Sequence, residues 1–165
     1  RTVNRWLRWN EPDKNALLTI AISLKIGENH LRDFMDWLEE IALRDGIGIR
    51  TVLENGSINE ALANPRLGRA DKIKRIKEQV RRLRFPRLSR TEDAIHARIR
   101  DLKLRSEIRL FVPPGLEGGA VKVEFTAGSQ EEFKQLVRRL AEAGDRESMR
   151  EIFSLLKGES VASSP

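Results

Sequence analysis

The sequence predicts a mainly α-helical protein with a small α+β module towards its C-terminal end. Along most of the chain, apolar residues recur at intervals of three and four, which is the period of an amphipathic helix. In contrast, Ile108, Leu110 and Val112 alternate with Arg109 and Phe111, and apolar residues alternate with polar ones over 121–125, which is the period of a half-buried strand. We therefore expect a helix-turn-helix-like N-terminal bundle, followed by a helix–β-hairpin–helix unit.

Composition excludes several classes of protein. The 165 residues contain no cysteine, so disulfides, thiol nucleophiles and cysteine-bound zinc are excluded. No apolar run approaches the roughly 20 residues that a membrane-spanning helix needs. No stretch resembles a signal peptide. These features lead us to expect a cytoplasmic protein that makes no contact with a membrane.

The first region, residues 1–68, is predicted to hold two main helices after a basic, tryptophan-bearing lead-in. Asn10 is a favourable residue to cap the first helix, and Pro12 suits its first turn. The second helix follows a short break and is expected to end at Gly46, because glycine commonly terminates helices. Glycine and proline interrupt residues 47–68, which predicts one or two brief helices there.

The first two helices have the apolar spacing of a helix-turn-helix motif. The residues that carry this spacing are Ile20, Ala21, Leu24, Ile26, Leu31 and Phe34. The second helix is acidic, and acids near phosphates repel them. Its acids are Glu28, Asp33, Asp36, Glu39 and Glu40. The pair is therefore either a DNA-reading motif or a plain helical hairpin in a small core.

A basic linker helix is predicted over residues 69–90. From Arg66 to Arg90, eleven Lys and Arg residues oppose two acids. An apolar stripe along the helix consists of Ile73, Ile76, Val80 and Leu83. Charge of one sign at this density is typical of nucleic-acid contact. The predicted phosphate contacts are Lys72, Lys74, Arg75, Arg81, Arg82, Arg84 and Arg87. The alternative is that the acidic second helix neutralises these cations.

Residues 91–157 are predicted to form a dimerisation module of a helix, two strands and one or two further helices, followed by a disordered tail over 158–165. Ser129 and Glu132 have the spacing of a capping box. A two-stranded hairpin is marginally stable alone, and its open edges invite pairing. We therefore expect a homodimer. Its predicted interface is Leu110, Val121, Val123, Phe125, Phe133, Leu136, Val137 and Leu140. The alternative is that the hairpin packs on the preceding helical region.

The sequence shows no recognisable catalytic arrangement. His30 and His96 are far apart and lack the spacing of metal ligands. The glycines after residue 114 suit a hairpin turn better than a phosphate loop. Trp6, Trp9 and Trp37 are candidates for stacking on bases, or else they anchor the core. We expect a protein that is not an enzyme and has no cofactor and no bound metal.

The segment from "TEDAIHARIRDLKL" through "EIRLFV" to "GGAVKVEFTAGSQEEFKQLVRRL" resembles the C-terminal dimerisation domain of ParB-type chromosome and plasmid partition proteins. The matching positions are Val121–Phe125, Ser129, Glu131, Glu132, Phe133, Leu136 and Leu140. The resemblance covers the last third of the chain well. It implies a bacterial, nucleoid-associated protein whose protomers pair through the second strand and the Leu-rich helix.

The same resemblance implies that Arg109 and Lys122 on the hairpin contact DNA without sequence preference. The predicted function is therefore DNA binding and homodimerisation within a ParB-like partition protein. The competing prediction is a protein-interaction module that binds no nucleic acid, whose acidic and basic helices pair with each other or with a partner.

Overall fold

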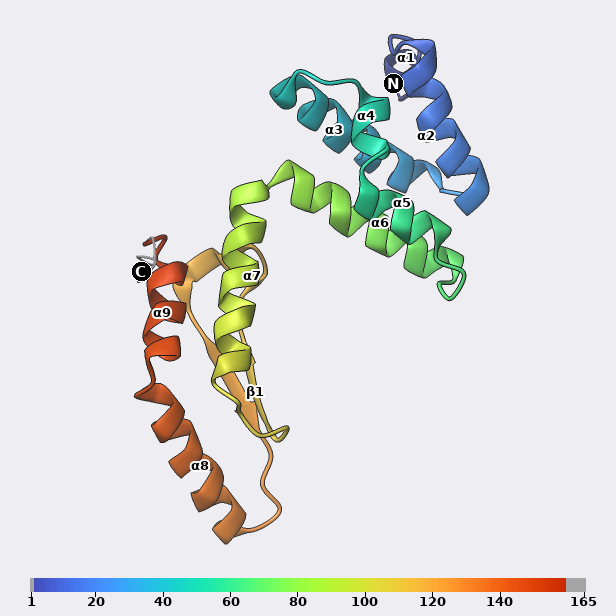
Figure 1. Ribbon diagram of the computed structural model, residues 1–165. Coiled ribbons are helices and arrows are strands. Elements are labelled where there is room, and N and C mark those ends of the chain that lie inside the picture. Colours follow the sequence, from blue (N-terminus) through green and yellow to red (C-terminus); the bar gives the residue numbers. More distant parts are fainter. Residues whose placement is uncertain (1, 160–165) are drawn as a thin grey trace. The chain divides into compact units, whose positions relative to one another are not determined.

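The computed structural model of the protein describes residues 2–159, and it divides into two compact units (Figure 1). The first unit extends to Pro86 and the second begins at Arg87. Within the described residues the chain is mainly helical, with one two-stranded antiparallel sheet. The predicted fold class is thus confirmed at that level, a mainly helical chain with a small β element.

The first unit consists of helices. They are α1 (Thr2–Trp6), α2 (Glu11–Leu24), α3 (Glu28–Asp45), α4 (Ile49–Leu53), α5 (Gly56–Ala63) and α6 (Arg69–Arg84). The side chain of Asn10 accepts a hydrogen bond from the Asp13 N–H at 2.8 Å, so the predicted cap of α2 is confirmed. Gly46, at φ 66°, ends α3 as expected, because this left-handed conformation suits glycine. Residues 47–68, where we expected one or two brief helices, form α4 and α5.

The core of the first unit is formed where α4 packs against α2 and α3, and where α6 packs against α3 and α5. Phe34 and Leu38 of α3 meet Ile58 of α5 and Ile76 of α6, all of them buried. The apolar stripe predicted on α6 is therefore present. The helix is a member of this core, whereas the sequence led us to treat it as a linker.

A buried carboxylate ties α4 to α2. Asp13 of α2 accepts hydrogen bonds from the Arg50 N–H at 2.6 Å and from the Asn10 side-chain amide at 2.9 Å. Gly48, which precedes α4, has no side chain with which to cap it. A Cβ there would lie 3.3 Å from the Asp13 carboxylate. Asp13 thus supplies the acceptor that the start of this five-residue helix lacks.

The second unit contains α7 (Pro86–Asp101), β1 (Ile108–Phe111), a 3₁₀ segment (Pro114–Gly119), β2 (Lys122–Phe125), α8 (Gln130–Gly144) and α9 (Glu147–Leu156). Ile108 lies opposite Phe125, and Leu110 lies opposite Val123. Opposed residues share one face of a sheet, so these four form the inner face. The predicted alternation is confirmed. Helix α7 starts earlier than expected, because proline is well suited to a first helical position.

The core of the second unit joins the hairpin to α7 and α9. Ile95 of α7, Leu102 just after it and Ile152 of α9 are buried, and Leu110 and Val121 of the hairpin pack against them. Figure 1 shows α7 running alongside the hairpin. Side-chain contacts add to this packing: Arg98 pairs with Glu151, and Arg146 donates to the Leu102 carbonyl at 2.8 Å.

Helix α8 begins with the predicted cap. The Ser129 hydroxyl accepts a hydrogen bond from the Glu132 N–H at 3.1 Å. The Glu132 carboxylate accepts one from the Gly128 N–H at 2.6 Å, one residue earlier than a standard capping box requires. Most of the tail that we expected to be disordered, residues 160–165, lies outside the described residues.

Candidate nucleic-acid interface

One flank of α6 faces the acids of α3. Lys77 donates to Asp33 at 2.9 Å and to the His30 ring at 3.3 Å. Arg84 donates to Glu40 at 2.9 Å. The hydrogen bond from Lys77 lowers the pKa of Asp33. On this flank the neutralising contacts that we considered as the alternative are present, and Arg84 belongs to them.

Trp37 and Arg44 of α3 complete this contact. The Trp37 ring lies 5.3 Å from the Lys77 ammonium and 5.8 Å from the Arg84 guanidinium, within the range of cation–π attraction. Arg44 donates to the carbonyls of Leu83 at 2.9 Å and Arg84 at 2.7 Å, which satisfies the end of α6. Trp37 therefore serves the contact between the two helices rather than forming a free stacking platform.

Lys72 lies on the opposite flank of α6, facing α5. Its ammonium donates to the Leu62 carbonyl at 2.6 Å, in the last turn of α5. A cation at this position satisfies a carbonyl that has no partner within its own helix. Lys72 is half-buried, and this hydrogen bond gives it a role inside the unit.

The outer side of α6 lies opposite its apolar stripe. It consists of Asp71, Lys74, Arg75, Glu78, Arg81 and Arg82, which follow one another at helical spacing. Lys74 and Arg75 are exposed, and within residues 2–159 neither has an ion-pair partner. Arg81 and Arg82 are half-buried, and Arg81 lies 3.3 Å from Glu78. This side carries four cations against two acids.

The acids of α3 also face α1. Arg5 pairs with Asp36 and Glu39, and these hydrogen bonds raise the pKa of Arg5. The Trp9 indole N–H donates to Glu39 at 2.7 Å. Further along α3, Leu43 is 87% exposed. On this side α3 thus presents acids that are already paired within the unit and an exposed leucine.

The outer face of the hairpin carries Arg109, Phe111, Lys122 and Glu124. Arg109 is directly opposite Glu124, and Phe111 is directly opposite Lys122. The Lys122 ammonium lies 2.5 Å from the Glu124 carboxylate, while Arg109 is exposed and has no ion-pair partner in the described part of the chain. Both predicted hairpin cations are therefore at the surface, together with a ring that the sequence analysis did not single out.

The remaining predicted phosphate contact, Arg87, is exposed near the start of α7. The structure thus brings Lys74, Arg75, Arg81 and Arg82 together on one side of α6. It assigns Lys72 and Arg84 to contacts within the first unit, and it places Arg109 and Lys122 together on the hairpin.

The side chains predicted at the dimer interface differ in how exposed they are. Leu136 is completely buried within a single copy, so it contributes to the packing of its own protomer. Phe133 and Val137 of α8 are 50% and 42% exposed. The Phe133 ring lies 5.6 Å from that of Phe125, which joins α8 to the end of β2. The others are half-buried: Leu110, Val121, Val123, Phe125 and Leu140. Helix α8 therefore leaves part of its apolar surface open.

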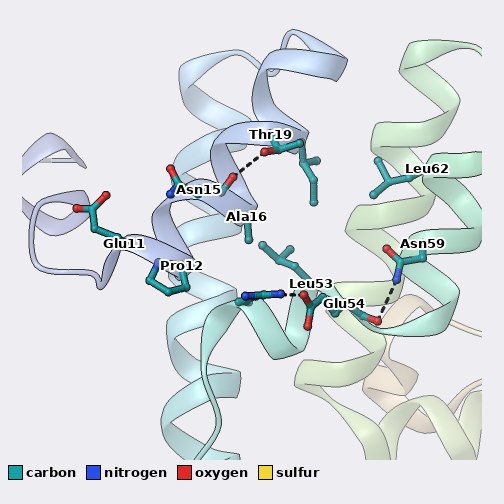
Figure 2. A pocket seen from close by; sticks show the side chains of 11 residues that line it. Glu11, Pro12, Asn15, Ala16, Thr19, Leu53, Glu54, Asn59 and Leu62 are labelled. Atoms are coloured by element: carbon teal, nitrogen blue, oxygen red, sulfur yellow. Dashed lines mark hydrogen bonds and ion pairs between the residues drawn. The ribbon is translucent and has the colours of Figure 1, made fainter.

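A groove of 590 Å³ lies between α2, α4 and α5 (Figure 2). Its apolar lining includes Ala16, Leu53 and Leu62. Polar groups on its rim bond within the chain, as where the Asn59 amide donates to the Glu54 carbonyl at 3.0 Å. The hydroxyl in its lining, that of Thr19, donates to the Asn15 carbonyl at 2.8 Å.

Within residues 2–159, no three His, Asp or Glu side chains meet in an arrangement that holds a metal ion. No helix of that range is long and apolar enough to cross a membrane. Comparisons of the chain with protein-family models, with curated proteins and with solved structures give no match.

Proposed function

We propose that the chain binds the DNA backbone without sequence preference and does so as a homodimer, in the manner of the ParB-type partition proteins that its last third resembles. The observation that carries this proposal is the outer side of α6. Lys74 and Arg75 stand exposed there, without ion-pair partners in the described part of the chain. Both side chains are therefore available to neutralise phosphates of the DNA backbone.

The charges of the first unit support this proposal. The acids of α3 that face other helices are engaged by Arg5, Lys77 and Arg84. The exposed Lys74 and Arg75 take no part in these contacts. Cations that neutralise phosphates release condensed counterions, and that release drives binding irrespective of sequence.

Dimerisation would raise the apparent affinity. Two protomers present two copies of the α6 surface, so the second contact occurs at the effective concentration set by the first. The exposed Phe133 and Val137 of α8 favour a second copy as the partner that covers them. Their position agrees with the Leu-rich helix through which the resemblance implies pairing.

The test compares two charge variants of the full chain by fluorescence anisotropy with a labelled generic duplex. One carries Lys74→Gln and Arg75→Gln. The control carries Arg8→Gln and Arg32→Gln, which removes the same charge from exposed positions elsewhere in the first unit. We expect the α6 variant to bind more weakly, and its salt slope to fall by about one for each cation removed. Equal weakening in both variants would show that net charge, not α6, attracts DNA.

The second candidate is an interaction module that binds protein alone. The ion pairs between α3 and α6 favour it, because in them part of the basic charge of α6 is paired with acids of the same chain. Under this function the duplex would not bind even at low salt.

A further inference from the structure

The outer face of the β-hairpin places an aromatic ring between cations. Phe111 is 42% exposed on this face. Lys122 is its directly opposed neighbour, and Arg109 lies two residues before it on the same strand. In a sheet, both neighbours lie roughly 5–7 Å away, within reach of a single bound nucleotide.

Among the four residues on the outer face of the hairpin, Phe111 alone is apolar. The inner face already holds the apolar residues that pack on α7 and α9, and the outer face is otherwise charged. Phe111 therefore contributes little to the core that its own strand helps to form. Exposed rings flanked by cations on an open sheet suit ligands that have both a flat apolar surface and negative charge.

We infer that the outer face of the hairpin binds single-stranded nucleic acid. One base stacks on Phe111, while Arg109 and Lys122 contact the flanking phosphates. This inference rests on the proposed function in giving the two cations to nucleic acid. It adds that the nucleic acid bound by these two cations is single-stranded.

The ring selects single strands over a duplex. In a duplex the base faces are stacked on one another, so only phosphates and groove edges are accessible, and an exposed phenyl ring gains little. In a single strand every base offers a free face, and stacking on an aromatic residue stabilises the complex without sequence preference. Without the ring, Arg109 and Lys122 would bind the phosphates of a single strand and of a duplex alike.

Glu124 offers a second test of the inference. Its carboxylate pairs with Lys122 and lies opposite Arg109, so it reduces the positive charge of this face. A strand bound across the face must compete with that carboxylate. Removing its charge with Glu124→Gln should therefore strengthen binding, an effect that a purely structural role for this face does not predict.

The experiment titrates the full chain into a fluorescein-labelled oligothymidine of about twelve nucleotides, within the site sizes usual for single-strand binders, at low salt. Phe111→Leu keeps an apolar side chain but removes the stacking surface, and we expect it to weaken binding about five- to a hundredfold. The control is Phe153→Leu, since Phe153 of α9 has the same 42% exposure. Glu124→Gln should tighten binding about two- to fivefold.

A duplex titration of the same variants separates this inference from the proposed function. Duplex binding that survives Phe111→Leu, with single-strand binding lost, supports both. Duplex binding with no binding of the oligothymidine overturns the inference alone. Oligothymidine binding without duplex binding overturns the role proposed for α6 alone. Equal losses in the Phe111 and Phe153 variants, or Phe111→Leu changing only self-association, would also overturn the inference.

Discussion

Helix α6 of the first unit buries its apolar stripe in a core, whereas helix α8 of the second unit leaves part of its apolar surface exposed. Helix α6 shows the first pattern, because Ile76 and Val80 are completely buried. Helix α8 shows the second, because Leu136 is buried while Phe133 and Val137 are not. Helix α6 therefore has its packing partners within its own unit, while α8 still has apolar surface to cover.

The largest expected effect tests the completeness of the first core. Ile76→Ala removes a side chain enclosed by α3 and α5, and the cavity should cost about 2–5 kcal/mol in the free energy of unfolding. Leu43→Ala, at an exposed position of α3, should change it by less than about 0.5 kcal/mol. Urea unfolding measures both. Similar losses in the two variants would show that the core is not closed as described.

The next effect tests the open surface of the second unit. Phe133→Asp with Val137→Asp places charge on the exposed side of α8 and leaves the buried Leu136 in place. We expect at least a hundredfold weaker self-association, about 2.7 kcal/mol, measured by sedimentation. Phe153→Asp, at an exposed position of α9, is the control. Dimers that persist in the double variant would contradict an interface on α8.

The buried carboxylate of the first unit gives the third prediction. Asp13→Ala leaves the Arg50 N–H without its acceptor, which should cost about 1–3 kcal/mol of the free energy of unfolding. Asp13→Asn retains an oxygen acceptor and should cost less. Thermal unfolding compares the two. If both variants lose the same amount, charge rather than the hydrogen bond is what matters at this position.

The smallest effect concerns the pair between Lys77 and Asp33. The pKa of Asp33 is lowered in the folded protein, so the pair stabilises the fold above the ordinary pKa of 3.8. That contribution is lost as the pH falls through the lowered folded value. The pair is partly exposed, so Lys77→Ala should cost only about 0.2–1 kcal/mol at pH 7, and the difference should disappear once acid has protonated Asp33. A difference that persists in acid would show that Lys77 acts through its packing on Trp37.

Local features of the fold were predictable from the sequence because neighbouring residues determine them. The caps at Asn10 and Ser129 and the end of α3 at Gly46 depend on one or two side chains. The alternation of the strands gave the correct inner face. By contrast, the apolar stripe of α6 has the same period in a linker as in a core helix, so the sequence did not show that α6 packs within the first unit.

The candidate interface was only partly predictable, since pairing depends on neighbours that are distant in the sequence. Lys72 meets a carbonyl of α5, and Arg84 meets an acid of α3. Neither contact can be read from the charge of α6 alone. Phe111 was visible as an apolar residue at a strand position where the pattern called for a polar one, and that break was the signal for the hairpin surface.

The most direct test of the proposed DNA binding is a salt titration of the wild-type chain on a generic duplex, followed by anisotropy. If the exposed Lys74 and Arg75 each contact a phosphate, the plot of log Kobs against log salt should have a slope of about −1.8 for each α6 surface engaged, at about −0.9 per contact. A slope near zero, or no binding at low salt, would contradict the account and favour a protein partner for these charges.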